Sequence, residues 1–578
     1  VMRLSFASLV SCVLVIGGCG STDGDDTVVP GSTLVVSPAA VQLELVNGAP
    51  VTQAYTVALV DPAGGSEDVT ARVAWSVSDP AFGGFTGATF TAGGARAGKG
   101  MVHATLDSIV GDAQIEITLR GIRVAADVTP DAPALFAAAV DDPAAAPAIV
   151  YPADQVIVPA NLGDLEAHWT DGHGHDLYEL SLKGDHVDQR VYVRGGTTAW
   201  AAFTAGEWEA AARSTDELAI GVRGLTASNP GRVGTAPGHR VTHAHEDLQG
   251  GLYYWAATSA GGGPYGIFRY DFGAVGQAAE PFYTTTEAGR CVACHALSRD
   301  GTRMAITFDG GDGTASVVDV ATRTPSPAPG AVAWNFAAYT PDGSHLITSS
   351  AGTLTVRDGA TAAAQGTVPT GGYATHPDVA PSGDALVYVR AGAPGADWHF
   401  TGGVITTISF DAASGAWGTP RALVSDGGNN YYPSYSPDGQ WILFNRSTED
   451  AYDDPSAELW VVKADGSMPP RKLDLANVAG GLTNSWARWA PFRNTWGPTG
   501  TNEDLYWITF SSKRAFGVRL PGGQPQLWMA AFFPGRVAVG GDPTGPAFRL
   551  PFQDIASNNH IAQWTETVVP IGKLTPRR

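Results

Sequence analysis

One short stretch of the sequence, GRCVACHALSRDG, groups side chains that can do redox or metal chemistry. Cys291, Cys294 and His295 form the pattern C-x-x-C-H, which places two thiols three positions apart beside an imidazole. The chain has four cysteines, and the other two, Cys12 and Cys19, lie in an N-terminal segment with the features of an export signal. An exported chain would therefore keep one tightly spaced pair and no framework of structural disulfides, which points to a chemical use for that pair.

The C-x-x-C-H spacing is typical of covalent haem attachment. Two thiols three positions apart can form thioethers to the two vinyl groups of one porphyrin, and His295 can then bind the iron as proximal ligand. One covalent haem c is the leading hypothesis, because export carries a chain to the compartment where such haem is attached. The alternatives are a thioredoxin-like redox pair, which lacks its usual βαβ surroundings here, and a strained disulfide or metal site.

The elements that must position this motif belong to an internal repeat. Its clearest copies are LSRDGTRMAITF, YTPDGSHLITSS, VAPSGDALVYVR and YSPDGQWILFNR, each with a tight turn before an alternating strand. Two degenerate copies follow, and the last strand, NNHIAQW, is expected to pair with strands near residue 252 and close a sixth blade. The repeat resembles that of TolB-type propellers, which implies a six-bladed β-propeller over residues 250–566, followed by a tail at 567–578.

Aligning the repeats on their turns puts six residues at equivalent positions. They are Cys294, Phe336, His376, Tyr432, Trp486 and, by a looser match, His560. The lead-in and first strand of a propeller blade line the central channel, so these side chains are expected to ring one channel mouth. The haem would then hang from the first blade, and Phe336, Tyr432 and Trp486 would form aromatic walls around it.

The ligand on the far side of the iron is less specified than the attachment site. His560 and His376 are the candidates, and an open or water-bound position is the alternative. Two histidine ligands would favour electron transfer, whereas an open position would favour peroxide or small-ligand chemistry. Two His-dense loops, DGHGHD and GHRVTHAHED, have residue types that bind Zn or Cu, although loop histidines are more often solvated.

Two further β-rich domains are expected before the propeller. Residues 33–124 alternate with period two between Gly, Pro and Asp turns, and their strand order resembles a bacterial Ig-like group 2 domain, which implies a spacer or adhesive unit. Residues 125–146 have the composition of an Ala/Pro linker. Residues 147–249 resemble a fibronectin-III-like sandwich with one helical insertion, FTAGEWEAAARS. The predicted fold class is all-β, with two β-sandwich domains preceding a six-bladed β-propeller.

The N-terminus resembles a bacterial lipoprotein signal. An apolar run follows Arg3 and ends in small residues before Cys19, which predicts a signal peptide at 1–18 and a tether at 19–32. The resemblance implies cleavage before Cys19 and lipid on that residue. No other apolar run is long enough to span a bilayer, so lipid is the only membrane anchor we expect. The predicted location is the bacterial cell envelope, at the outer membrane, facing the periplasm or the surface.

The net charge of −21 argues against a nucleic-acid partner. The leading prediction is an envelope-anchored lipoprotein whose propeller carries one haem c for electron transfer or redox sensing, with an envelope protein or redox partner. One alternative is a docking module of the cell envelope, and another is a haem-dependent peroxidase or oxidase. The motifs G-x-S-x-G, Walker A and H-E-x-x-H are absent from the sequence, so whether the chain is an enzyme stays open.

Overall fold

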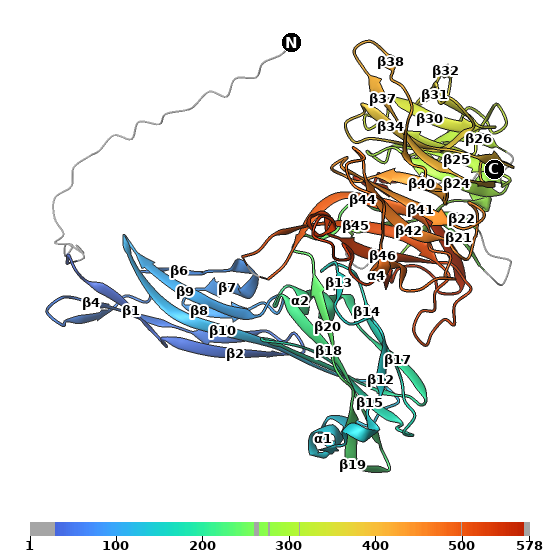
Figure 1. The fold of residues 1–578 in the computed structure, drawn as a ribbon. Helices are drawn as coiled ribbons and strands as arrows, with labels where there is room; N and C mark the ends of the chain where they lie inside the picture. The colour runs from blue at the N-terminus through green and yellow to red at the C-terminus, as the bar shows by residue number, and fades with distance from the viewer. Residues whose placement is uncertain (1–28, 259–264, 275–277, 311–312, 499, 572–578) are drawn as a thin grey trace, which may run out of the picture.

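The structure is a computed structural model that describes residues 29–258, 265–274, 278–310, 313–498 and 500–571. Two sandwich regions precede a propeller, and the chain is β-structure almost throughout (Figure 1). The predicted signal peptide and lipid-bearing Cys19 lie outside the described residues. Within the described part of the chain, none of the helices combines the length and the apolar character that a membrane crossing needs.

The first sandwich packs short strands around a core that includes Tyr55, Phe82 and Phe90. Its elements are β1 (Thr33–Ser37), β2 (Ala40–Val46), β3 (Val51–Ala54), β4 (Thr56–Val60), β5 (Ser66–Asp68), β6 (Ala74–Val77), η1 (Pro80–Phe82), β7 (Gly83–Thr86), β8 (Thr89–Ala92), β9 (Gly98–Leu106) and β10 (Ile109–Val124). Buried and exposed residues alternate along much of β10, as the period-two pattern predicts. The Ig-like family assignment stays a prediction.

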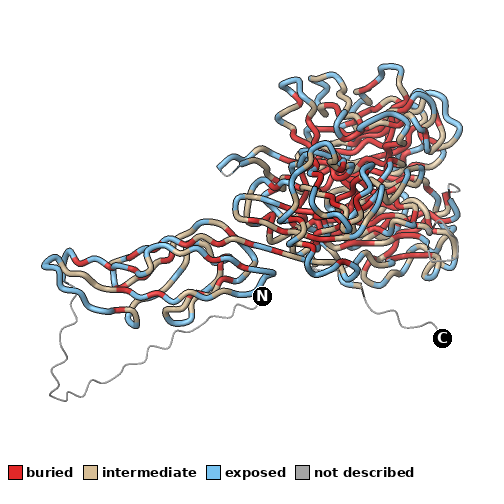
Figure 2. Tube along the Cα trace, turned by 90° about the horizontal axis from the view of Figure 1, so that it is seen from below, coloured by how far each residue is buried: buried red, intermediate tan, exposed pale blue. Residues whose placement is uncertain are grey.

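The long strand β10 joins the two sandwich regions. It pairs antiparallel with β9, and its last residues pair in parallel with β16 (Val187–Arg194) of the second region. One hydrogen-bonded sheet therefore continues from the first region into the second. Figure 2 shows the first sandwich as a slender arm with much exposed surface, projecting from a compact mass with a buried interior.

The segment predicted as a linker is instead folded. It contains α1 (Ala132–Ala138), β11 (Val140–Asp141) and η2 (Pro143–Ala145), and Phe136 of α1 is buried against Tyr192. The Ala/Pro composition was misleading because proline is well tolerated in the first turn of a helix, where both short helices place it. One buried aromatic side chain then fixes α1 to the sheet.

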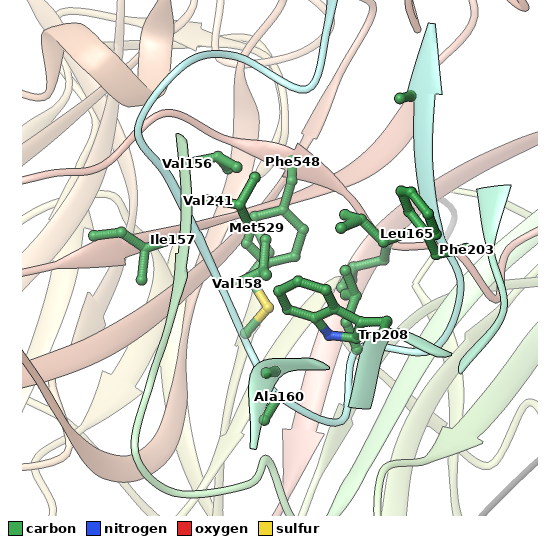
Figure 3. Packing of buried hydrophobic residues seen from close by; sticks show 14 of the residues in the cluster. Val156, Ile157, Val158, Ala160, Leu165, Phe203, Trp208, Val241, Met529 and Phe548 are labelled. Carbon is green, nitrogen blue, oxygen red and sulfur yellow. The ribbon is translucent and has the colours of Figure 1, made fainter. Parts of the chain in front are cut away.

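The second region forms a sandwich that packs directly on the propeller. Its other elements are β12 (Ala148–Tyr151), β13 (Val156–Val158), β14 (Leu165–Thr170), β15 (Leu177–Gly184), β17 (Thr198–Phe203), α2 (Ala205–Ala212), β18 (Glu217–Thr226), β19 (Asn229–Thr235) and β20 (His239–His243). The helix α2 is the predicted insertion, and Thr204 and Glu207 form its capping box. Figure 3 shows Val158 and Trp208 packed in one cluster with Met529 of the propeller.

Six sheets, each built on a path of four strands, form the propeller. Their innermost strands contact one another in a closed ring: β24 (Val292–Leu297), β29 (Phe336–Tyr339), β33 (Ala374–Val379), β40 (Asn429–Tyr435), β44 (Ser485–Trp496) and β48 (Ser557–Thr565). We number blades 1 to 6 in this order. The predicted six-bladed propeller is therefore confirmed by its own sheets.

The outer strands complete each blade. They are β25 (Arg303–Phe308), β26 (Thr314–Asp319), β27 (Thr324–Ser326) and β28 (Val332–Ala333) in blade 1; β30 (His345–Ser350), β31 (Thr353–Asp358) and β32 (Ala364–Thr367) in blade 2; β34 (Ala385–Arg390), β37 (Val404–Asp411), β38 (Ala416–Trp417) and β39 (Arg421–Val424) in blade 3; β41 (Trp441–Ser447), β42 (Glu458–Lys463) and β43 (Arg471–Lys472) in blade 4; β45 (Glu503–Ser512), β46 (Gln526–Phe532) and β47 (Phe548–Arg549) in blade 5; and β21 (Gly251–Thr258), β22 (Gly266–Asp271) and β23 (Glu280–Thr284) in blade 6. Short helices α3 (Thr285–Ala288), α4 (Asp474–Asn477) and α5 (Pro534–Val537) lie between strands.

Blade 6 is closed from both ends of the domain. Its last strand in sequence, β48, pairs antiparallel with its first, β21, which confirms the predicted clasp. The described part of the predicted tail folds back onto this blade junction, where the hydroxyl of Thr567 donates to the carbonyl of Asp300, 2.6 Å away. The repeated turns have the predicted chemistry, because Gly301, Gly343 and Gly439 all adopt φ near 70° (69°, 69° and 72°), a region that favours glycine.

Candidate functional site

The cysteine motif begins immediately after a short helix. Thr284 and Glu287 form a capping box at the start of α3, and Gly289 ends the helix with φ 66°. The backbone then enters the propeller, where the Cys291 carbonyl accepts a hydrogen bond from the Asp309 amide at 3.1 Å. Cys291 therefore lies at the entry to β24, and Cys294 lies within that strand.

The strands β24, β33, β40 and β44 are bulged at the positions that the repeat alignment selects, whereas β29 pairs regularly at Phe336. The strand pairing slips at His376, Tyr432 and Trp486, whose φ values are 49°, 48° and 55°. Positive φ is unusual for bulky residues, and bulges re-aim side chains. The bulged ring positions are therefore local irregularities of the sheet that turn large side chains into the channel.

Blade 6 follows the same rule one residue later than the sequence alignment proposed. The bulge in β48 begins at Ile561, which has φ 58°, so Ile561 is the structural equivalent of Trp486. His560 pairs with Trp255 just before the bulge. The looser repeat match at the C-terminus therefore carried an offset of one residue, although His560 still reaches the same mouth.

The structure brings five of the six aligned residues into one pocket of about 270 Å³ at a channel mouth. The pocket is lined by Trp255, Cys291, Val292, Ala293, Cys294, Thr307, Gly310, Asn335, Phe336, Trp398, Tyr432, Tyr452, Trp486, His560 and Ile561. Both cysteines are free thiols and partly exposed. The predicted wall residues thus surround the two thiols on one apolar surface.

Three aromatic rings in mutual contact form the floor of this pocket. The rings of Tyr432 and Trp486 stack with their centroids 4.1 Å apart, and Phe336 lies 5.9 Å from Tyr432 and 6.1 Å from Trp486. All three side chains are buried. Aromatic contacts of this kind favour particular ring orientations, so the three rings form a packed apolar floor.

The rim of the pocket comes from a hairpin inserted in blade 3, formed by β35 (Ala393–Pro394) and β36 (Phe400–Thr401). Its Asp397 accepts hydrogen bonds from the Asn335 side chain and from the amides of Ala351 and Gly352, at 2.9–3.0 Å. This carboxylate ties the insertion to blade 2. Trp398, the next residue, therefore has a fixed place over the mouth.

A histidine–carboxylate pair stands beside Trp398 on the rim. The ring of His399 lies 3.9 Å from that of Trp398 and 5.6 Å from that of Tyr452, and its Nδ1 is hydrogen-bonded to Asp450. The sequence repeat does not predict these rim residues, because the insertion falls outside it. The long connection between β34 and β37 was the feature of the sequence that could have indicated an insertion.

His560 is the imidazole that the pocket presents to the two thiols. Its ring lies 4.7 Å from that of Trp255, at 65°, and the Trp255 indole N–H donates to the carbonyl of Val292 at 2.8 Å. Within the described residues His560 has no hydrogen-bond partner. Burial lowers the pKa of His560 to about 4, so its ring is neutral at pH 7.

His295 lies outside the thiol pocket. Neighbouring residues of a strand point to opposite faces, and His295 is buried at 5% exposure, with its Nε2 3.4 Å from the carbonyl oxygen of Tyr253 in blade 6. Its Nδ1 is buried and has no hydrogen-bond partner among the residues that the structure describes. Burial lowers the pKa of His295 to about 4. The motif histidine therefore occupies the space between blades 1 and 6.

His376, the other predicted ligand, also lies outside the thiol pocket. It sits beneath the floor, with ring centroids 4.1 Å from Phe336 and 4.2 Å from Tyr432, and lines a narrow cavity of about 20 Å³ with His295. Its Nδ1 accepts a hydrogen bond from the Tyr432 amide at 3.4 Å, and its buried Nε2 has no partner in the described part of the chain. His376 therefore lies on the inner side of the aromatic floor, in a cavity that Cys294 also lines and Cys291 does not.

The two thiols and the nearby imidazole fit the possible chemistries of the motif unequally. Burial raises the pKa of the Cys294 thiol to about 12, whereas a thioredoxin-like pair needs a thiol with a lowered pKa. Two free thiols beside aromatic walls and a neutral imidazole fit covalent haem. The one feature that does not fit is the orientation of His295.

The His-dense loops of the second sandwich have local partners. His175 contacts Asp171 at 2.7 Å, His239 the Pro152 carbonyl at 2.8 Å, and His243 the Thr215 carbonyl at 3.0 Å. Among the residues that the structure describes, no three or more His, Cys, Asp or Glu side chains are grouped to hold a metal ion.

The opposite channel mouth has a different character. Its pocket of about 130 Å³ is lined in part by Asp378, Arg488 and Gln563. The guanidinium of Arg488 donates to the neighbouring Ala487 carbonyl at 3.0 Å, and Asp378 accepts from the Tyr435 amide at 2.7 Å. Burial raises the pKa of Asp378 to about 6.

Comparison with known proteins gives fold likeness only. No protein-family model matches the sequence, and no curated protein matches it. Among solved structures, TolB from Acinetobacter baumannii is 12% identical, with a TM-score of 0.36 over 61% of this chain and 80% of its own. Hydrazine synthase from Kuenenia stuttgartiensis is 17% identical (TM-score 0.29, 46% and 67% covered), and a TolB protein from Agrobacterium tumefaciens is 16% identical (TM-score 0.29, 55% and 99% covered). At these values the propeller assignment rests on the six sheets themselves.

Proposed function

We propose that this protein is an envelope-anchored lipoprotein whose propeller carries one covalent haem c, for electron transfer or redox sensing. The haem is held by Cys291 and Cys294 at the aromatic mouth of the channel, and Cys19 carries the lipid. The partner is a redox protein of the envelope.

The observation that carries this proposal is the shared pocket of the two thiols. Cys291 and Cys294 line one apolar cavity of about 270 Å³ with Phe336, Tyr432 and Trp486. Such walls suit a flat, apolar group and exclude water from it. Because both thiols belong to a C-x-x-C-H sequence, that group is best explained as a porphyrin attached by two thioethers.

The residues of the chain divide the work between attachment, orientation and shielding. The thiols would attach the group, and the stacked floor of Tyr432 and Trp486 would limit how far it could enter the channel. Trp398, fixed by the Asp397 anchor, would shield it at the rim. When bound, the haem supplies a one-electron couple whose potential depends on its axial ligand and its burial.

Covalent haem is tested by expressing the full chain with and without a haem-maturation system. The pyridine haemochrome spectrum of the matured protein is expected to show one haem with both vinyl groups saturated. Cys291→Ser and Cys294→Ser should each leave one thioether at most, and the double variant none. A matured wild-type protein that carries no covalent haem contradicts the proposal.

The His399–Asp450 pair supports a second candidate function, a haem-dependent peroxidase. A histidine oriented by a carboxylate can accept and return a proton, and this one stands on the rim of the thiol pocket. The test is peroxide turnover by the ferric protein. A His399→Ala variant with unchanged haem content should lose at least tenfold of that turnover, whereas an equal rate in wild type and variant leaves electron transfer as the function.

A further inference from the structure

We infer that His560, rather than the motif residue His295, is the imidazole that ligates the haem iron. This inference rests on the proposed function, because it concerns the ligand of the haem attached at Cys291 and Cys294. It assigns the ligand to the clasp strand β48, far from the motif in sequence.

The two imidazoles differ in how they lie relative to the thiols. His560 lines the thiol pocket together with both Cys291 and Cys294, whereas His295 shares only the narrow cavity of about 20 Å³ with Cys294. His560 is partly exposed to that pocket and has no hydrogen-bond partner within the described residues. A nitrogen that is free and faces the attachment site needs no rearrangement of the fold to bind a metal there.

His295 is held in a close-packed junction of the propeller. Its ring is 5% exposed between blades 1 and 6, with Nε2 near the Tyr253 carbonyl. Val292, three residues before His295, and Met304, on the strand that pairs with β24, are both fully buried in the blade 1 core. Bringing His295 to the thiol side would remove it from this close-packed junction and leave a cavity in its place.

Contacts with its neighbours hold the His560 ring in a fixed position. Its ring makes an edge contact with Trp255, and the indole of Trp255 is tied to the Val292 carbonyl, one residue after Cys291. The bulge that follows at Ile561 ends the regular pairing of β48 at this point. The imidazole is therefore linked through one tryptophan to the strand that carries the thiols.

The inference has a structural consequence. The thiols belong to blade 1, and His560 belongs to the strand that closes blade 6. A haem bound to both would join the two blades across the seam at which the propeller closes. Haem loading is then expected to slow hydrogen exchange in β48 and β21 of wild type.

The test uses the full chain expressed with a haem-maturation system, in wild type, His560→Ala and His345→Ala. His345 is a matched control, because it lies in blade 2 beyond the turn and contacts Ser344. The C-x-x-C-H sequence stays intact in all three, so covalent haem content should be equal by pyridine haemochrome. The readouts are the iron–histidine stretching band of the ferrous protein by resonance Raman and hydrogen exchange in β48.

We expect wild type and His345→Ala to show the same iron–histidine band. His560→Ala should lose it, regain a nitrogen-ligated spectrum on addition of imidazole, and lose the haem-dependent protection of β48. An iron–histidine band that persists or first appears in His560→Ala overturns the inference and assigns the ligand to His295. Absence of covalent haem from wild type is a different result, since it contradicts the proposed function itself.

Discussion

The two mouths of the propeller channel are built by the same six strands and differ in almost every chemical respect. One mouth is apolar, with two thiols, three packed aromatic rings and the imidazole of His560. The other is polar and holds Arg488, Asp378 and Gln563. The repeat alone cannot produce this difference, because both mouths draw on every blade.

Two local features create the asymmetry. Bulges in β40, β44 and β48 turn large side chains toward the thiol mouth, and the blade 3 insertion adds Trp398 above them. The polar mouth keeps the regular turns of the repeat, including Pro341, Pro381 and Pro437. Bulges gather where a sheet re-aims a side chain for function, so specialisation is concentrated at the thiol end.

Removing the floor of the thiol mouth should have the largest effect on stability. Trp486→Ala takes away a buried ring that stacks on Tyr432, and we expect a loss of about 3–5 kcal/mol in the free energy of unfolding. Chemical denaturation measures it. Tyr452→Ala on the rim, where the side chain is 44% exposed, is the control and should cost under about 1 kcal/mol. Equal losses would mean that the floor is not a packed layer.

The buried His295 should make stability depend on pH. Burial lowers its pKa in the folded protein to about 4, so the unfolded chain binds a proton at higher pH than the folded one. The stabilisation is complete above the unfolded pKa of about 6.5 and is lost as pH falls toward 4, by about 3 kcal/mol. Denaturation of haem-free wild type and His295→Gln at pH 7 and pH 4 should show this extra loss in wild type. Parallel pH profiles would refute it.

Releasing the rim should have a smaller, more local effect. Asp397→Ala leaves three donors from blade 2 without their acceptor, which we expect to cost about 2 kcal/mol. Hydrogen exchange should accelerate in residues 393–401 and stay unchanged in β44. Exchange that increases evenly over the propeller would show that Asp397 supports the whole domain.

The polar mouth should tolerate change best. Arg488 and Asp378 are both desolvated, and the charge of each shifts the pKa of the other. The double variant Arg488→Met/Asp378→Asn removes both charges together and should alter stability by less than about 1 kcal/mol, because a buried charge pair contributes little net stability. Haem content, measured by absorbance per chain, should be unchanged. Loss of haem from this variant would mean that the two mouths are coupled.

The internal repeat was sufficient to predict the propeller fold from the sequence, including the clasp between β48 and β21. It also placed Phe336, Tyr432 and Trp486 around Cys294, because each lies six residues before its turn. It could not place His295 or His376, because a bulge decides which of two neighbouring residues faces the channel. Trp398 and His399 lie in an insertion, where no repeat position applies, and Phe136 showed that Ala/Pro composition alone does not predict a linker.

The most direct test of the account is the mass of the matured protein. After expression of the full chain with a haem-maturation system and proteolysis, the peptide that spans Cys291 and Cys294 should carry the mass of one haem, stable to acid. The peptides of Cys291→Ser/Cys294→Ser should carry none. A wild-type peptide with its unmodified mass, holding two free thiols or a disulfide, would contradict the central claim that this channel mouth is a haem site.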